Sequence, residues 1–224
     1  MVMVDPDYRR RGIATRLMTR ALEYVRQRGK VRAVLGVPST NVPAMDMYVK
    51  LGFRAFENSI CFVGETGSFV APEDIDGVVI RPLRNDDLDE VYTLVEASED
   101  PVRLKMYDFR KSNLKTSLLA RFFRTSKETK FVAVYSGRIV GYAEVSYTTP
   151  NEVGRFGFVH ANIEGKKLGV EKLLVNSARR EVENGGVNRF GIIVPSTQQE
   201  LVETVKALGF KKAFAVDGMA AEFS

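Results

Sequence analysis

The chain has 224 residues, of which 45% are hydrophobic and 27% charged, and this balance excludes wholesale disorder and predicts one large or two small globular domains. It contains no apolar run of membrane-spanning length, and the early charge of its N-terminus is atypical of a signal peptide. Cys61 is the single cysteine and there is one histidine, so the sequence predicts neither an internal disulfide nor a Cys/His zinc site. We therefore expect a metal-free protein in the reducing cytoplasm.

Positive charge is concentrated near the N-terminus. The whole chain has a net charge of +5, yet residues 1–32 alone hold nine basic and three acidic side chains. Such a cluster attracts anions, so a phosphorylated small molecule and nucleic acid are both candidate ligands. A solvated helix face would also account for the arginines from position 16 onward. The basic residues are Arg9, Arg10, Arg11, Arg16, Arg20, Arg26, Arg28, Lys30 and Arg32.

The first elements predicted along the chain are a helix, a strand, a second helix and one or two strands. Apolar residues recur at every fourth position from Ile13 to Val25, which predicts a helix that Gly29 ends. Residues 31–37 are apolar and β-branched, as in a strand. Asn41 is a suitable N-cap for the next helix, and residues 53–63 have the composition of one or two short strands.

The rest of the chain alternates between strand and helix patterns in the order β-α-α-β-β-β-α-β-α-β-β. The polar turn Ser136-Gly137 predicts a hairpin between two of these strands. The predicted strands are 78–83, 130–135, 139–147, 155–162, 188–194 and those after 208, and the predicted helices are 86–97, 114–125, 169–184 and 198–208.

The sequence repeats itself at one constant offset. Gly12 falls on Gly169, the VPST of residues 37–40 falls on the VPST of residues 194–197, and the LGF of residues 51–53 recurs at the same spacing. Chance seldom preserves one offset over some forty positions, so we infer two homologous copies.

The two copies differ in completeness. Residues 78–224 read as a whole domain, residues 71–77 as a linker, and residues 1–70 as only the C-terminal half of a domain. A half-domain leaves a sheet edge and apolar helix faces without partners. Three solutions stay open: residues that precede Met1, coverage by the second domain, and a homodimer in which two chains complete one another.

Gly12 and Ala14 mark a candidate phosphate site. They lie where a basic turn enters the first helix, and free backbone N–H groups and the helix dipole favour an anion there. Small residues at this point allow a phosphate to approach the backbone. A basic helix start with a glycine kept for packing is the alternative.

Two motifs of the first copy together resemble the GCN5-related N-acetyltransferase (GNAT) family. Residues 9–14, RRRGIA, are similar to its acetyl-CoA signature, Arg/Gln-x-x-Gly-x-Gly/Ala, and residues 35–53, LGVPSTNVPAMDMYVKLGF, are similar to its second conserved block. The resemblance implies the acyl-CoA N-acyltransferase fold, an α/β (α+β) fold with a mixed, mostly antiparallel sheet flanked by helices. This chain would hold one partial and one complete copy, as in tandem acetyltransferases with one degenerate domain.

The resemblance also implies an acetyl-CoA site in the first copy. Backbone amides of residues 10–15 would hold the pyrophosphate, and a strand ending at Met3–Val4 would pair with the pantetheine arm. The residues assigned to the coenzyme are Met3, Val4, Arg9, Arg10, Arg11, Gly12, Ile13, Ala14, Thr15 and Asn41.

Asn41 and Tyr48 are the two side chains to which the resemblance gives a polar role. Asn41 would hydrogen-bond the coenzyme arm, and Tyr48 would be the general acid that protonates the departing thiolate. Two simpler roles stay open: Asn41 as a plain N-cap, and Tyr48 as a packed aromatic.

The second copy keeps the residues of the fold and changes those of the chemistry. A carboxylate at its Glu171 would repel a pyrophosphate, and Val205 has no proton to give. We therefore expect a degenerate second domain without an acetyl-CoA site. The replacements are Lys166 for Arg9, Glu171 for Ala14, Gln198 for Asn41 and Val205 for Tyr48.

The general base cannot be identified from the sequence. His160 and Glu164 lie near the equivalent place in the second copy, and a lone histidine on a strand is more often structural. Asp5 and Asp7 belong to the signature itself and are expected to be loop residues.

The resulting expectation is an acetyl-CoA-dependent N-acetyltransferase that acts on a primary amine of a small molecule or protein. A non-catalytic acyl-CoA-binding or regulatory protein is the alternative from another class. A basic nucleic-acid binder is disfavoured, because aromatic and basic residues are not interleaved on one face. No membrane partner is expected.

Overall fold

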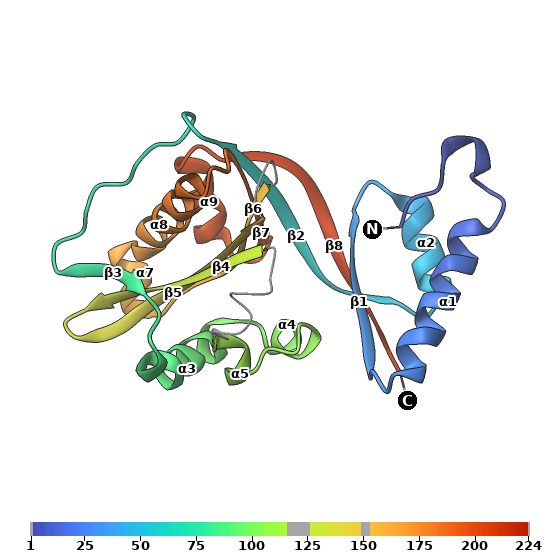
Figure 1. The fold of residues 1–224 in the computed structure, drawn as a ribbon, viewed down its shortest axis with the longest axis horizontal. Helices are drawn as coiled ribbons and strands as arrows, with labels where there is room; N and C mark the ends of the chain where they lie inside the picture. Colours follow the sequence, from blue (N-terminus) through green and yellow to red (C-terminus); the bar gives the residue numbers. More distant parts are fainter. Residues whose placement is uncertain (1, 116–125, 149–152, 224) are drawn as a thin grey trace. The chain divides into compact units, whose positions relative to one another are not determined.

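The computed structural model describes residues 2–115, 126–148 and 153–223. Their internal contacts define two compact units, the first made of residues 1–58 and 215–224 and the second of residues 59–214 (Figure 1). No helix in these described stretches is both long and apolar enough to cross a membrane.

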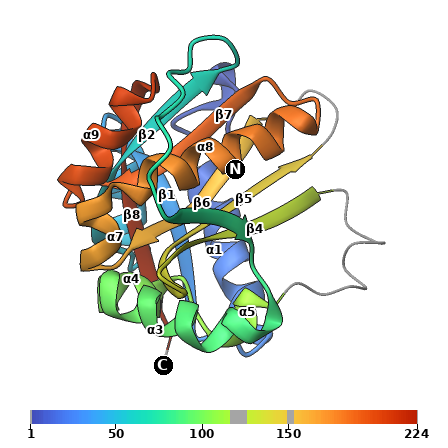
Figure 2. The ribbon, with the colours of Figure 1, turned by 90° about the vertical axis from the view of Figure 1, so that its left-hand side faces the viewer.

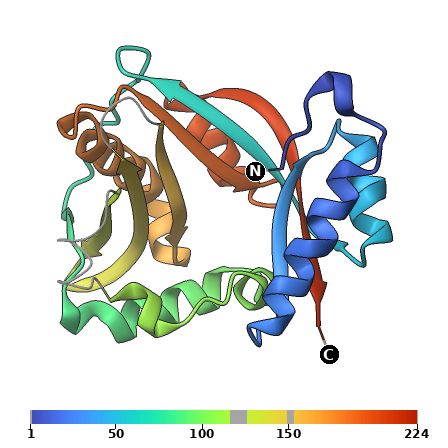
Figure 3. The same ribbon diagram turned by 45° about the vertical axis from the view of Figure 1, so that its right-hand side comes forward.

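The first unit is built from two helices and a small group of strands. Both helices cover the same side of the paired strands β1 and β8 (Figure 3). Its core holds Met18 and Leu22 of α1 against Phe53 and Met219. The elements are a 3₁₀ turn (Pro6–Tyr8), α1 (Ile13–Gln27), β1 (Arg32–Pro38), α2 (Val42–Lys50), the start of β2 (Arg54–Glu65) and the end of β8 (Lys211–Glu222).

The second unit contains a sheet in the order β2-β7-β6-β5-β4-β3, in which only the β6–β7 pair is parallel. The fold class inferred from the resemblance is confirmed. The elements are β3 (Val78–Pro82), a 3₁₀ turn (Asn85–Asp87), α3 (Leu88–Ser98), α4 (Pro101–Met106), α5 (Lys111–Leu114), β4 (Ser126–Tyr135), β5 (Arg138–Thr148), β6 (Val153–Ala161), α7 (Ile163–Leu168), α8 (Val170–Asn184), β7 (Arg189–Pro195) and α9 (Gln199–Ala207).

Helices cover both faces of this sheet. Helix α8 lies across β4, β5 and β6 on one face, and α3 and α5 pack on the other (Figures 1 and 2). Two strand glycines let α8 approach. A Cβ on Gly154 would lie 2.4 Å from a methyl of Val182, and one on Gly141 would lie 2.8 Å from a methyl of Leu174. Any larger residue at Gly154 would push the helix off the sheet.

The sequence repeat is visible in the structure, because equivalent helices and strands begin and end at the same offset. α1, β1, α2 and β2 begin and end 157 positions before α8, β7, α9 and β8, as Ile13 and Val170 illustrate. The strand pairs are also equivalent. β1 pairs antiparallel with β8, and β7 pairs antiparallel with β2 in the matching register. Each copy therefore pairs its own central strand with the last strand of the other copy.

Most predicted elements are confirmed within a few residues, and some differ. Residues 2–5 are not a strand, which corrects the expected strand at Met3–Val4, since no neighbouring strand pairs with them in the described chain. Residues 54–65 form one continuous strand, which is one of the two expected alternatives, whereas residues 211–222 form one strand where two were expected. Helices α4 and α7 were not predicted. The predicted helix 114–125 lies mostly outside the described residues. The domain limits 1–70, 71–77 and 78–224 follow the repeat and stay a prediction, since the compact units divide the chain otherwise.

Candidate functional site

The basic turn before α1 is stabilised by hydrogen bonds between its own side chains and its own backbone. Asp5 caps the 3₁₀ turn by accepting from the Asp7 N–H at 3.0 Å. Arg9 Nε donates to the Val4 carbonyl at 3.0 Å, and Arg11 donates to the Asp7 carbonyl at 3.2 Å. Two of the predicted phosphate arginines therefore also fix the turn, and both remain exposed. Asp5 and Asp7 are loop residues, as expected.

Gly12 turns the chain into α1. Its φ of +72° lies in the left-handed region, which glycine adopts without strain, and no side chain caps the helix at this point. The first turn of bonding begins with Arg16 N–H to the Gly12 carbonyl at 3.0 Å. The amides of Ile13, Ala14 and Thr15 consequently keep their donors free of side-chain acceptors in the described chain.

The other predicted coenzyme contacts lie on exposed backbone. Arg10 has a φ of +60°, an uncommon conformation for a residue with a side chain. Met3 is 74% exposed and Val4 is half-buried. The structure thus presents the arginine turn and the start of α1 as one continuous basic surface segment, residues 9–15.

Asn41 is the N-cap of α2. Its side-chain oxygen accepts from the Ala44 N–H at 3.4 Å. The simple capping role is therefore present in the structure. When the oxygen caps the helix, the Nδ2 group of the same side chain remains as the donor that a ligand could meet.

Tyr48 lies on α2 and is half-buried. Its ring packs edge-on against Phe53, with centroids 5.7 Å apart and planes at 61°. The packing role is therefore also present. Its hydroxyl has no hydrogen-bond partner among the described residues, so the proton that the predicted mechanism requires is not committed elsewhere in the unit.

The second copy repeats this geometry with different chemistry. Gly169 has a φ of +75° and begins α8 without a side-chain cap, as Gly12 begins α1. The segment before it is the helix α7 rather than an open turn. Glu171 is 93% buried at the second position of α8, and Val205, at the place of Tyr48, is fully buried in the core. The loss of an acetyl-CoA site from the second copy stays a prediction.

Burial raises the pKa of Glu171, and the nearby charge of Glu200 raises it further, while Lys166 lowers it. In the described chain no donor hydrogen-bonds the Glu171 carboxylate and no cation pairs with it at short range. This contrasts with Glu99, which is also buried.

Glu99 lies in a polar cluster that the sequence did not reveal. Its carboxylate is 2.8 Å from Arg103 and 3.4 Å from His160 Nε2, and it accepts from the Asp100 N–H at 2.9 Å. Burial raises the pKa of Glu99, but the contact with His160 and the charge of Arg103 outweigh burial and hold it below its usual value. Helix periodicity could not indicate this pair, because Glu99 follows the end of α3 whereas Arg103 lies in the short helix α4.

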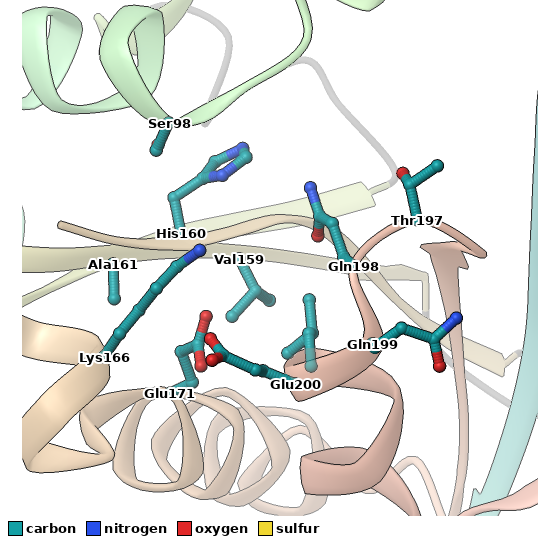
Figure 4. Close-up of a pocket in the computed structure, with 11 residues that line it drawn as sticks. Ser98, Val159, His160, Ala161, Lys166, Glu171, Thr197, Gln198, Gln199 and Glu200 are labelled. Carbon is teal, nitrogen blue, oxygen red and sulfur yellow. The ribbon is translucent and has the colours of Figure 1, made fainter. Parts of the chain in front are cut away.

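A cavity of about 290 Å³ opens in the second unit beside this cluster (Figure 4). It lies where β6 and β7 separate. The two strands pair over residues 153–155 and 189–191, and the cavity is lined by residues that follow these paired segments in the chain. His160 and Ala161 line it from β6, and residues 197–201 line it from the start of α9. Glu171 and Lys166 complete the wall.

Three other groups of residues are weaker candidates for a functional site: metal ligands, Cys61 and Glu164. Within the described residues, no three His, Cys, Asp or Glu side chains gather as a metal site would require. Burial raises the pKa of the half-buried Cys61 thiol, which disfavours its reactive thiolate form. Glu164 lies in α7 and is half-buried.

Comparison with known proteins finds similarity to acetyltransferases near the N-terminus. A family model described as Acetyltransferase (GNAT) family matches residues 1–53. An uncharacterised N-acetyltransferase from Methanocaldococcus jannaschii is 43% identical over 56 residues, which are 25% of either chain. A mycothiol acetyltransferase from Saccharomonospora viridis is 38% identical over 60 residues, 27% of this chain and 20% of that protein. The chain thus spans a quarter or less of the length of these relatives.

Solved structures share the fold over nearly the whole chain. A tandem GNAT protein from the clavulanic acid biosynthesis pathway aligns with a TM-score of 0.69 and 18% identity, over 98% of this chain and 73% of that one. A GCN5-related N-acetyltransferase from Sphaerobacter thermophilus aligns with a TM-score of 0.64 and 16% identity, over 98% and 70%. The chain therefore has the fold of GNAT acetyltransferases, and its residues 1–53 match the model of that family.

Proposed function

We propose that the chain is an acetyl-CoA-dependent N-acetyltransferase whose donor site is the basic surface segment of residues 9–15. The observation that carries the proposal is the start of α1. Gly12 adopts a left-handed conformation, no side chain caps the helix, and three arginines precede it. A helix start of this kind binds phosphate groups, because its free amides and its dipole both favour negative charge.

The residues present fit a pyrophosphate. Gly12 has no side chain, and a Cβ on it would meet open space, so the approach to the amides of residues 13–15 is not obstructed there. Ala14 adds one methyl group. Within the described residues, the Arg10 side chain forms no hydrogen bond or ion pair, so its guanidinium can turn to a phosphate oxygen. When bound, acetyl-CoA supplies a thioester whose carbonyl carbon is attacked by an amine, so that a C–N bond forms and the C–S bond breaks.

Tyr48 is proposed to give its hydroxyl proton to the departing sulfur. Its position on α2, one helix away from the arginine turn in the same compact unit, agrees with this role. Asn41 fixes the start of the same helix, so its capping bond supports the placement of Tyr48.

The test is a Tyr48→Phe variant, which keeps the ring against Phe53 and removes the proton. The readout is release of free coenzyme A thiol from acetyl-CoA in the presence of a panel of primary amines. We expect kcat to fall by roughly 10²–10⁴ with little change in the affinity for acetyl-CoA. Tyr24→Phe is the matched control, since Tyr24 is exposed on α1 and contacts Arg28.

Two outcomes would contradict the proposal. If Tyr48→Phe turns over like the parent chain, Tyr48 only packs. If acetyl-CoA binds but no amine in the panel is acetylated, the chain is a non-catalytic acyl-CoA-binding protein.

A further inference from the structure

The cavity of the second unit holds an acidic side chain that forms no ion pair or hydrogen bond within the described chain. Glu171 is 93% buried, and its carboxylate points into the cavity (Figure 4). Among the residues that the structure describes, none donates a hydrogen bond to it. A largely buried carboxylate without a donor is costly, so a proton or a cationic partner would stabilise this one.

The groups around Glu171 make the cavity acidic. Glu200 lines the same wall from the first turn of α9, and its charge acts on Glu171. Lys166 is the cation among the described lining residues, and its charge lowers the pKa of Glu171, but its side chain is exposed and forms no ion pair with either glutamate in the described chain. Arg103 and Glu99 lie behind His160 and neutralise one another.

The cavity does not suit a coenzyme. Its volume of about 290 Å³ lies at the lower end of the range for ligand cavities, roughly 300–1,000 Å³. The segment that would receive a pyrophosphate is the helix α7, and Glu171 occupies the first turn of α8. A metal ion is also disfavoured, since the described residues hold no set of three ligands.

We propose that this cavity binds a small molecule with a protonated primary amine, whose ammonium group donates to Glu171 and is further held by Glu200. An ammonium carries three donors, so one group can satisfy both carboxylates. Charge-assisted hydrogen bonds of this kind are stronger than neutral ones. The proposal does not depend on acetyl-CoA binding to the first unit.

The test is a calorimetric titration of the full chain at neutral pH, without acetyl-CoA, using three four-carbon probes. Putrescine carries amines at its ends, butanediol carries neutral hydroxyls, and succinate carries carboxylates. We expect putrescine alone to bind. Glu171→Gln removes the buried charge at almost constant shape and should weaken putrescine binding at least about tenfold, and Glu200→Gln should weaken it less.

Glu203→Gln is the matched control, because Glu203 lies on α9 but pairs with Lys206 at the surface. Its putrescine affinity should equal that of the parent. Thermal melts of each variant show whether it is folded. The proposal is wrong if putrescine does not bind, if butanediol binds equally well, or if Glu171→Gln binds putrescine like the parent chain.

Discussion

Two buried glutamates of the second unit have opposite environments. Glu99 faces Arg103 and His160, and its pKa is held below the usual value although burial alone would raise it. Glu171 has no such partner, and burial raises its pKa. The two side chains are equally hidden, so the difference between them comes from pairing rather than from depth.

Glu99→Gln should destabilise the protein. The substitution removes the carboxylate that the largely buried Arg103 contacts, which costs roughly 3 kcal/mol of unfolding free energy near pH 7. Because the folded chain lowers the pKa of Glu99, this stability is present above the unfolded value of about 4.3 and is lost as the pH falls. Urea denaturation at several pH values measures it, with the exposed Glu96→Gln on the same helix as control. A loss independent of pH would contradict the pairing.

Glu171→Gln should have the opposite effect on stability to Glu99→Gln. The folded chain holds the Glu171 proton more tightly than the unfolded chain does, so that stability is present below about pH 4.3 and is lost as the pH rises through the raised pKa. Replacing the carboxylate with an amide should therefore stabilise the protein near pH 7, by roughly 1 kcal/mol, and the gain should vanish in acid. The measurement is the same denaturation series. Destabilisation near pH 7 would show that the carboxylate is satisfied in the folded protein.

Helices α1 and α8 begin alike and differ at their second residue. Both start after a left-handed glycine without a side-chain cap. Ala14 leaves the start of α1 accessible, whereas Glu171 puts a carboxylate at the start of α8. The repeat thus supplies its own comparison between a helix start suited to phosphate and one that is not.

Ala14→Glu gives the first copy the residue that the second copy has at the equivalent position, Glu171. A carboxylate at this position adds bulk and like charge where the pyrophosphate is proposed to lie, so the affinity for acetyl-CoA should fall at least about tenfold. The melting temperature should hardly change, since acidic residues are favourable in the first turn of a helix. Titration and thermal melting of the same variant measure both. Parent-like affinity would mean that this turn does not hold the pyrophosphate.

The elements were largely predictable because their apolar spacing is regular. Apolar residues at every fourth position predict α1 and α8, and the constant offset transfers each assignment from one copy to the other. Helices α4 and α7 were missed because they span only six residues each, too short for periodicity to show. The strand at Met3–Val4 was wrong, since a strand needs a partner that local sequence does not report.

The candidate site was predictable in position but not in detail. The residue types at Gly12, Ala14 and Asn41 mark the turn and the cap. The bonds of Arg9 and Arg11 to the backbone of the turn depend on its folded shape. The contact between Glu99 and His160 joins residues about sixty positions apart, so no local pattern could have indicated it.

At the scale of the whole molecule, the two copies share strands. Residues 59–65 of the first copy pair with β7 of the second, and residues 216–222 of the second copy pair with β1 of the first. Neither repeat therefore has all of its strand pairing within its own sequence. This explains why the compact units and the repeat boundaries do not coincide, and it means that binding should be measured on the full chain.

The central claim is that one copy holds the donor site and the other has lost it. Calorimetric titration of the full chain with acetyl-CoA tests this most directly, together with the Ala14→Glu and Glu171→Ala variants. We predict one site per chain, weakened by Ala14→Glu and not doubled by Glu171→Ala, because the segment before Gly169 is the helix α7 rather than an open basic turn. Two equivalent sites per chain, or a single site that Ala14→Glu leaves intact, would contradict the account.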